Sequence, residues 1–232
     1  AGYCFPKAII KMNLNTILMK PRSLFIICTY LLLISFANSF AQTQILAWSK
    51  VNDKKSAGYA ITTDEFDNVY VVGLVDADGL NTNRDIITVK YNALGVLQWE
   101  KTYNGPGNGN DDFALMENTG LVVPLMDIAV DINGNVYVAA PSRGIGTDLD
   151  YTTLAYDPDG NSLWINRYDG GTGANEVSTA LAVDASGTYV YVTGNAGTFR
   201  YSTANGSTDT IWGAAPKTEI FGRDIAIGQN GN

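Results

Sequence analysis

The sequence predicts an all-β protein made of β-propeller blades, each a four-stranded antiparallel meander. Three observations predict this fold: an Asp-initiated, β-rich motif recurs three times, a Tyr-to-Trp segment follows each copy, and Asn-Gly or Asp-Gly pairs separate short apolar runs. Such pairs between β-branched and aromatic runs are the strongest short-range signals of hairpins. Because the chain after residue 41 has no sustained 3.6-residue period, we expect almost no helix.

The first half of the repeat starts at Asp64, Asp131 and Asp184, with steps of 67 and 53 residues between the copies. In each copy the Asp precedes turn residues and a run rich in Val and Tyr, although the first copy lacks the turn glycine of the other two. The segment from Asp224 to the end of the chain repeats the one that begins at Asp127. We therefore expect about three blades and the start of a fourth, in a repeat domain that is truncated at its C-terminus.

The second half of the repeat runs from a tyrosine to a tryptophan, at Tyr91 to Trp99, Tyr156 to Trp164 and Tyr201 to Trp212. The first two spacings are both 8 residues and the third is 11. Because aromatic side chains dominate core burial, we expect Trp99, Trp164 and Tyr137 to pack between neighbouring blades.

The second copy predicts four strands in order, at residues 128–130, 136–138, 151–156 and 163–168. An Asn-Gly turn, a variable loop at 141–150 and an Asp-Pro-Asp-Gly-Asn turn at 157–161 connect them. The expected blades cover roughly 48–103, 104–168, 169–212 and, in part, 213–232, within a repeat domain of residues 42–232. A β-sandwich is the rival all-β fold, but it does not explain a four-element unit with internal sequence identity.

The first 41 residues have the composition of a targeting segment. A basic stretch at 19–22 precedes an apolar run at 24–37, and Ser39 and Ala41 place small residues before a cleavage site. This pattern predicts a signal peptide at 19–41, cleaved after Ala41, behind an upstream or non-native extension at 1–18. The alternative is a membrane anchor, but the run of about 14 residues is shorter than the ~20 that a spanning helix needs.

Composition and charge exclude several classes of function. The chain has no His, which removes Ser-His and Cys-His nucleophile pairs and His-ligated zinc or haem. All 23 acidic residues follow Ala41, and the formal net charge is -8. This acidic balance argues against nucleic acid or an anionic membrane surface as a partner. Cys4 and Cys28 precede the predicted cleavage site, so the mature protein would contain no disulfide.

The pattern of an apolar strand, then D-x-x-G-N-V-Y-V-x-G, then a Tyr-to-Trp hairpin resembles the bacterial SBBP β-propeller repeats. The resemblance covers roughly residues 45–232, nearly all of the predicted mature chain. Members of that family are typically secreted or surface proteins, some with an S-layer-like character. The resemblance therefore implies an extracellular scaffold or binding module, and it supplies no catalytic residues to carry over.

Two acidic turns have oxygen-bearing side chains at alternate positions, as calcium loops do at their start: the turn that begins at Asp131 and the turn that begins at Asp157. Neither has the glutamate that closes an EF-hand loop. Asp and Asn are also the ordinary residues of hairpin turns, where they accept hydrogen bonds from backbone amides. We favour this structural role over a bound cation, so the sequence assigns no metal ligand and no cofactor.

The longest insertion, at residues 104–126, begins with a Gly-rich stretch. Its Asp111, Asp112 and Glu117 could form a carboxylate pair for glycoside cleavage. We favour a solvated surface loop, because loops that tolerate insertion are usually exposed. No catalytic residue is assigned.

The sequence thus predicts a non-enzymatic extracellular module that binds a protein or a polysaccharide through its blade loops, with no membrane span after cleavage of the signal peptide. The alternative from another class is part of a secreted carbohydrate-active enzyme that uses carboxylates. A purely architectural spacer in a cell-surface layer is a third possibility.

Overall fold

The computed structural model describes residues 49, 56–76, 79, 83–111, 126–171, 175–209 and 222–228. Within them the chain is all-β, with eleven strands and no helix, so the predicted fold class is confirmed at this level. The predicted extension at 1–18, the predicted signal peptide at 19–41 and Trp212 lie outside the described residues. No helix in the described part of the chain is both long and apolar enough to cross a membrane.

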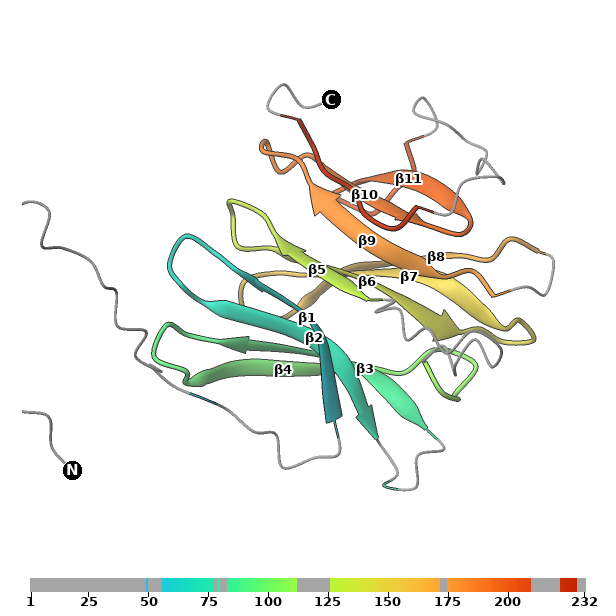
Figure 1. Ribbon diagram of the computed structural model, residues 1–232, viewed down its shortest axis with the longest axis horizontal. Coiled ribbons are helices and arrows are strands. Elements are labelled where there is room, and N and C mark those ends of the chain that lie inside the picture. Colours follow the sequence, from blue (N-terminus) through green and yellow to red (C-terminus); the bar gives the residue numbers. More distant parts are fainter. Residues whose placement is uncertain are drawn as a thin grey trace, which may run out of the picture. The chain divides into compact units, whose positions relative to one another are not determined.

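The strands form three antiparallel sheets (Figure 1). The first sheet has the order β1 (Ser56–Thr63), β2 (Val69–Asp76), β3 (Arg84–Tyr91) and β4 (Leu97–Tyr103). The second has the order β5 (Asp127–Val130), β6 (Val136–Arg143), β7 (Leu149–Tyr156) and β8 (Ser162–Tyr168). The third has the order β11 (Gly197–Ser202), β10 (Tyr189–Gly194) and β9 (Ser178–Val183). Each sheet is a meander of sequential strands, and none of the three closes on itself.

The four strands predicted in the second copy are present as β5 to β8, but the predicted loop at 141–150 is wrong. β6 continues to Arg143 and β7 begins at Leu149, so only residues 144–148 connect them. β5 pairs with β6 only as far as Ala139, whereas Pro141 lies beyond that point, opposite Tyr151 of β7. At such a position the missing N–H of proline costs no ladder hydrogen bond on the β5 side.

The turns explain how the first copy folds without its glycine. The β5–β6 and β7–β8 turns contain Gly134 and Gly160 with φ of 82° and 81°, a conformation that glycine adopts without steric cost. In the β1–β2 turn, Asp67 adopts φ of 59°. Aspartate tolerates this region better than most residues, so the first copy keeps the turn although it has Asp67 where the second copy has Gly134.

The second sheet is buried on both faces because its strands alternate. Val136, Val138 and Leu154 belong to a core cluster shared with the first sheet, whereas Tyr137 and Ala155 belong to one shared with the third. Successive side chains of a strand point to opposite faces, which accounts for this division. Figure 1 shows the second sheet between the other two.

Trp99 and Trp164 occupy equivalent positions between adjacent sheets, as predicted. Each side chain is 9% exposed. The indole N–H of Trp99 donates to the carbonyl oxygen of Pro158 at 3.0 Å, and that of Trp164 donates to Thr203 at 2.7 Å. Each acceptor belongs to the turn after the third strand of the next sheet, so the same contact joins two successive pairs of sheets.

Glycine is required beneath each of these tryptophans. A Cβ placed on Gly160 would lie 2.8 Å from Cδ2 of Trp99, and one placed on Gly206 would lie 2.5 Å from Cε3 of Trp164. These distances are shorter than any ordinary carbon contact, so the glycines allow the indole rings to approach the backbone closely.

Candidate functional site

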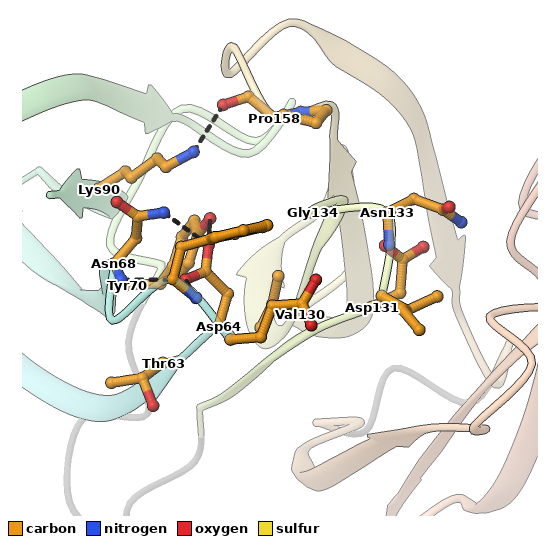
Figure 2. Close-up of a pocket in the computed structure, with 13 residues that line it drawn as sticks. Thr63, Asp64, Asn68, Tyr70, Lys90, Val130, Asp131, Asn133, Gly134 and Pro158 are labelled. Atoms are coloured by element: carbon orange, nitrogen blue, oxygen red, sulfur yellow. Dashed lines mark hydrogen bonds between the residues drawn. The ribbon is translucent and has the colours of Figure 1, made fainter. Parts of the chain in front are cut away.

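A pocket of about 320 Å³ lies where turns of the first and second sheets meet (Figure 2). Most of its wall comes from the β1–β2 turn, at residues 63–68, and the β5–β6 turn, at residues 130–134. Tyr70, Lys90 and Pro158 complete it. The two main segments are the same part of consecutive repeat copies, so sheet packing brings these turns together.

The wall on the first-sheet side is organised by Asp64. Its Oδ1 accepts hydrogen bonds from the backbone N–H groups of Phe66 and Asn68, both at 2.9 Å. Its Oδ2 accepts from Nδ2 of Asn68 at 2.8 Å and from the hydroxyl of Tyr70 at 2.9 Å. The carboxylate thus fixes both the turn and the side chains around it.

Asp131 performs the same task on the second-sheet side. Its Oδ1 accepts from the backbone N–H groups of Asn133 at 2.8 Å and Asn135 at 2.9 Å. Its Oδ2 accepts from Nδ2 of Asn135 and from the hydroxyl of Tyr137. The pocket is therefore bounded by two turns of the same design, each held rigid by its own carboxylate.

The electrostatics of the pocket favour an anionic Asp64. Burial alone would raise the pKa of this carboxyl, but hydrogen bonds from Asn68, Tyr70 and the turn backbone outweigh it and hold the pKa below its ordinary value of 3.8. Burial and the neighbouring Asp64 raise the pKa of Tyr70, which therefore stays a protonated donor. Lys90 supplies a positive charge, with Nζ 3.1 Å from the carbonyl oxygen of Pro158 and 5.2 Å from the centre of the Tyr70 ring.

Two apolar side chains at the pocket are exposed to solvent. Phe66 and Ile132 line it, and each is 71% exposed. Asn68, Asn133 and Lys90 supply polar groups to the lining of the same pocket. An apolar surface flanked by fixed donors and acceptors suits a ligand that has both hydroxyl groups and C–H faces.

The acidic turn at 157–161 has the predicted structural role. Oδ1 of Asp157 accepts from the backbone N–H groups of Asp159 at 3.0 Å and Asn161 at 2.7 Å, and Oδ2 accepts from Nδ2 of Asn161 at 2.8 Å. Only Pro158 of this turn reaches the pocket. The contacts made by Asp131 confirm the same capping role there.

The prediction of a solvated loop is wrong at Asp111, which is fully buried. Its carboxylate accepts hydrogen bonds from the backbone N–H of Gly105 at 2.8 Å, from Oγ of Ser142 at 3.0 Å and from the backbone N–H of Arg143 at 2.9 Å. Burial raises the pKa of Asp111, against the effect of these hydrogen bonds. Asp111 thus anchors the start of the insertion to the end of β6, so a substrate has no access to it. Asp112 and Glu117 lie outside the described residues.

Sequence reasoning did not single out Phe66, Ile132 or Lys90. The signal that could have found the two apolar residues lies in the turns themselves, because Phe66 is the second residue after Asp64 and Ile132 is the first residue after Asp131. Turn positions that are usually polar hold large apolar residues here. Exposed apolar residues that gather at one place indicate an interaction surface.

Asp64 provides a test of the turn geometry. Because its folded pKa is depressed, its stabilising contribution is fully present above the unfolded value of 3.8 and is lost as the pH falls through the folded pKa. Asp64→Asn should lower the free energy of unfolding by about 1 kcal/mol at neutral pH. The difference from the unsubstituted chain should disappear at pH values below the folded pKa, as measured by urea unfolding across a pH series.

Glu65 is the matched control, because it is an exposed neighbour in the same turn. Glu65→Gln should change stability by less than about 0.5 kcal/mol over the same pH range. Equal effects of the two substitutions would contradict the assigned role of Asp64.

No family model matches the chain, and no curated protein matches it. Among solved structures, it is similar to the crystal structure of a protein of unknown function from Bacteroides caccae, with a TM-score of 0.45 and 11% sequence identity. The match covers 79% of this chain and 54% of that one, so the chain spans about half the length of this structural neighbour.

Proposed function

We propose that the chain forms blades of a β-propeller and works as a non-enzymatic binding module in a secreted or cell-surface bacterial protein. The observation that carries this proposal is the repeated contact between sheets, in which Trp99 and Trp164 reach equivalent turns of the next sheet. A propeller consists of consecutive four-stranded meanders that pack face to face, with the same contacts between each pair of neighbours. The SBBP-like repeat pattern supports the same assignment.

The proposed location rests on the segment at 19–41. Its basic stretch, apolar run and small residues before Gln42 are the features on which signal peptidase acts. A mature protein that begins at Gln42 is the expected product of export, and N-terminal sequencing of the exported protein tests it.

The pocket between the β1–β2 and β5–β6 turns is the proposed binding surface, and a polysaccharide is the proposed ligand. The apolar side chains of Phe66 and Ile132 offer a surface for the C–H faces of sugar rings. The amides of Asn68 and Asn133 offer both donors and acceptors for hydroxyl groups. The same turns recur in each copy, which suits a ligand that itself repeats.

A glycan array followed by titration of the best polysaccharide tests this function. Phe66→Ser should weaken binding about tenfold or more, which corresponds to ~1.4 kcal/mol. Phe66 is largely exposed, so we expect the fold to survive. Leu94→Ser is the matched control, since Leu94 is 80% exposed in the β3–β4 turn and does not line the pocket.

The other two hypotheses give different results in the same experiment. Release of reducing sugar from the bound glycan would favour the carbohydrate-active enzyme. No binding to any glycan would favour the architectural spacer or a protein partner. Equal effects of the Phe66 and Leu94 substitutions would contradict the pocket as the binding surface.

A further inference from the structure

Three carboxylates from separate segments meet near the junction of the second and third sheets. Asp150 is the second residue of β7, Asp169 directly follows β8, and Glu176 precedes β9. One oxygen of each lies within 4.8 Å of the other two. The cluster lies at the strand ends opposite to those that form the pocket, because β7 starts here and ends at the 157–161 turn.

Two of these carboxylates have a buried oxygen without a partner in the described part of the chain. The side chain of Asp150 is 5% exposed, and Glu176 is 6% exposed. Oδ1 of Asp150 and Oε2 of Glu176 are both buried and accept no hydrogen bond from the residues that the structure describes. Buried polar atoms are almost always paired, since an unpaired one loses its hydration without compensation. This observation is independent of the clustering, and it leaves two buried carboxylate oxygens available to a ligand.

The backbone holds the cluster in place. The N–H of Glu176 donates to the carbonyl oxygen of Leu149 at 2.6 Å, which fixes Glu176 beside β7. Oδ1 of Asp169 accepts from the N–H of Gly171 at 2.8 Å. A Cβ on Gly170 would lie 2.6 Å from Oε1 of Glu176, so glycine permits the close approach of this carboxylate to the chain.

The charges of the cluster are not balanced by the ion pair that it contains. Nη2 of Arg167 contacts Oδ2 of Asp150 at 2.6 Å. Three carboxylates against one guanidinium leave about two negative charges in a largely buried place.

We propose that Asp150, Asp169 and Glu176 bind a calcium ion that clamps β7, β8 and the segment before β9 together. Carboxylate oxygens are the ligands of hard cations, and Ca²⁺ accepts them at about 2.3–2.6 Å. Two oxygens bound to one Ca²⁺ can therefore be up to ~5 Å apart, whereas Mg²⁺, with ligands at about 2.0–2.1 Å, allows only ~4.2 Å. The oxygens of the cluster lie within 4.8 Å of one another, which is inside the calcium limit, and water completes the coordination. This site is independent of the proposed pocket.

The wild-type chain, stripped of metal with EDTA and dialysed, is titrated with CaCl₂ in a calorimeter and melted with and without it. We expect binding of one ion with a Kd of about 1 mM or tighter, a rise in melting temperature, and binding of Mg²⁺ at least about tenfold weaker. The absence of both heat and a thermal shift at about 10 mM CaCl₂ would overturn the proposal.

Asp169→Asn is the decisive variant, because Asp169 is exposed and its loss should leave the fold intact. It should weaken calcium binding by about tenfold or more, as should Glu176→Gln. Asp159→Asn is the control, an exposed carboxylate in the 157–161 turn, and it should bind like wild type. Terbium luminescence excited through Tyr168, the neighbour of Asp169, gives a readout that does not depend on stability.

A shared proton between Glu176 and Asp150 is the competing explanation of the unpaired oxygens. It predicts that Glu176→Gln is at least as stable as wild type without metal and that calcium changes neither protein. That result, or unaltered calcium binding by Asp169→Asn, would refute the calcium site.

Discussion

Replacing Trp99 by alanine should lower the free energy of unfolding by about 3–5 kcal/mol. The side chain is almost fully buried in the core cluster shared by the first and second sheets. Its ring centre lies 6.3 Å from that of Tyr70 in its own sheet and 6.0 Å from that of Tyr156 in the next. The substitution removes this packing and also the donor to the carbonyl oxygen of Pro158.

The test is urea unfolding followed by circular dichroism, which does not depend on the lost tryptophan. Trp164→Ala should cost about as much, since Trp164 makes the equivalent contact with Thr203 and lies 6.0 Å from the ring of Tyr137. Leu97→Ala is the control, because Leu97 is also on β4 but is 50% exposed, and it should cost less than about 1 kcal/mol.

If Trp99→Ala does not fold, Trp99→Phe keeps much of the packing and removes the indole donor. That variant should cost about 1–3 kcal/mol. A loss below about 1 kcal/mol for both alanine variants would mean that the sheets do not depend on each other for stability. It would contradict the packing on which the propeller assignment rests.

The strands and the two inter-sheet tryptophans could be predicted because the information is local and repeated. Alternating Val and Tyr residues set which face of a strand is buried, and Asp131 with Gly134 sets the turn. The Tyr-to-Trp spacing was the same in the first two copies, so equivalent surroundings for Trp99 and Trp164 followed from the repeat. A departure from the repeat did not change the fold: in the first turn, Asp67 adopts the positive φ that glycine adopts in the second copy.

The buried polar contacts could not be predicted, because they join residues that no pattern relates. Asp111 lies in a Gly-rich stretch that has the composition of a surface loop, yet it is bound by Ser142 and Arg143 at the end of β6. β6 can continue through Pro141 because β5 is short and pairs with β6 only as far as Ala139. The hydropathy pattern does not reveal the length of β5. The pocket and the carboxylate cluster likewise depend on which copies become neighbours.

Arg167 is the residue where these unpredicted contacts converge. Nη1 donates to the hydroxyl groups of Tyr103, Ser142 and Thr152 at 2.9–3.0 Å. Nη2 donates to the carbonyl oxygen of Ser142 at 2.8 Å and to Oδ2 of Asp150 at 2.6 Å. The guanidinium therefore ties the end of β4 to three strands of the second sheet and neutralises a carboxylate that has almost no access to water.

Arg167→Met should lower the free energy of unfolding by about 3–5 kcal/mol in EDTA. Most of this loss comes from the Asp150 carboxylate, which is left in a buried place without its ion-pair partner. The double substitution Arg167→Met with Asp150→Asn should therefore cost clearly less than the sum of the two single substitutions.

The matched control is Arg143→Met, because Arg143 also pairs with an aspartate but on the surface. Its guanidinium is 3.6 Å from Asp148, and the two side chains are 40% and 52% exposed. Solvent screens such a pair, so its removal should cost at most about 1 kcal/mol. Additive effects of Arg167→Met and Asp150→Asn, or equal losses for the two arginine variants, would contradict the buried ion pair as a source of stability. Comparing the two arginine variants thus measures how much more a buried ion pair contributes to the free energy of unfolding than an exposed one.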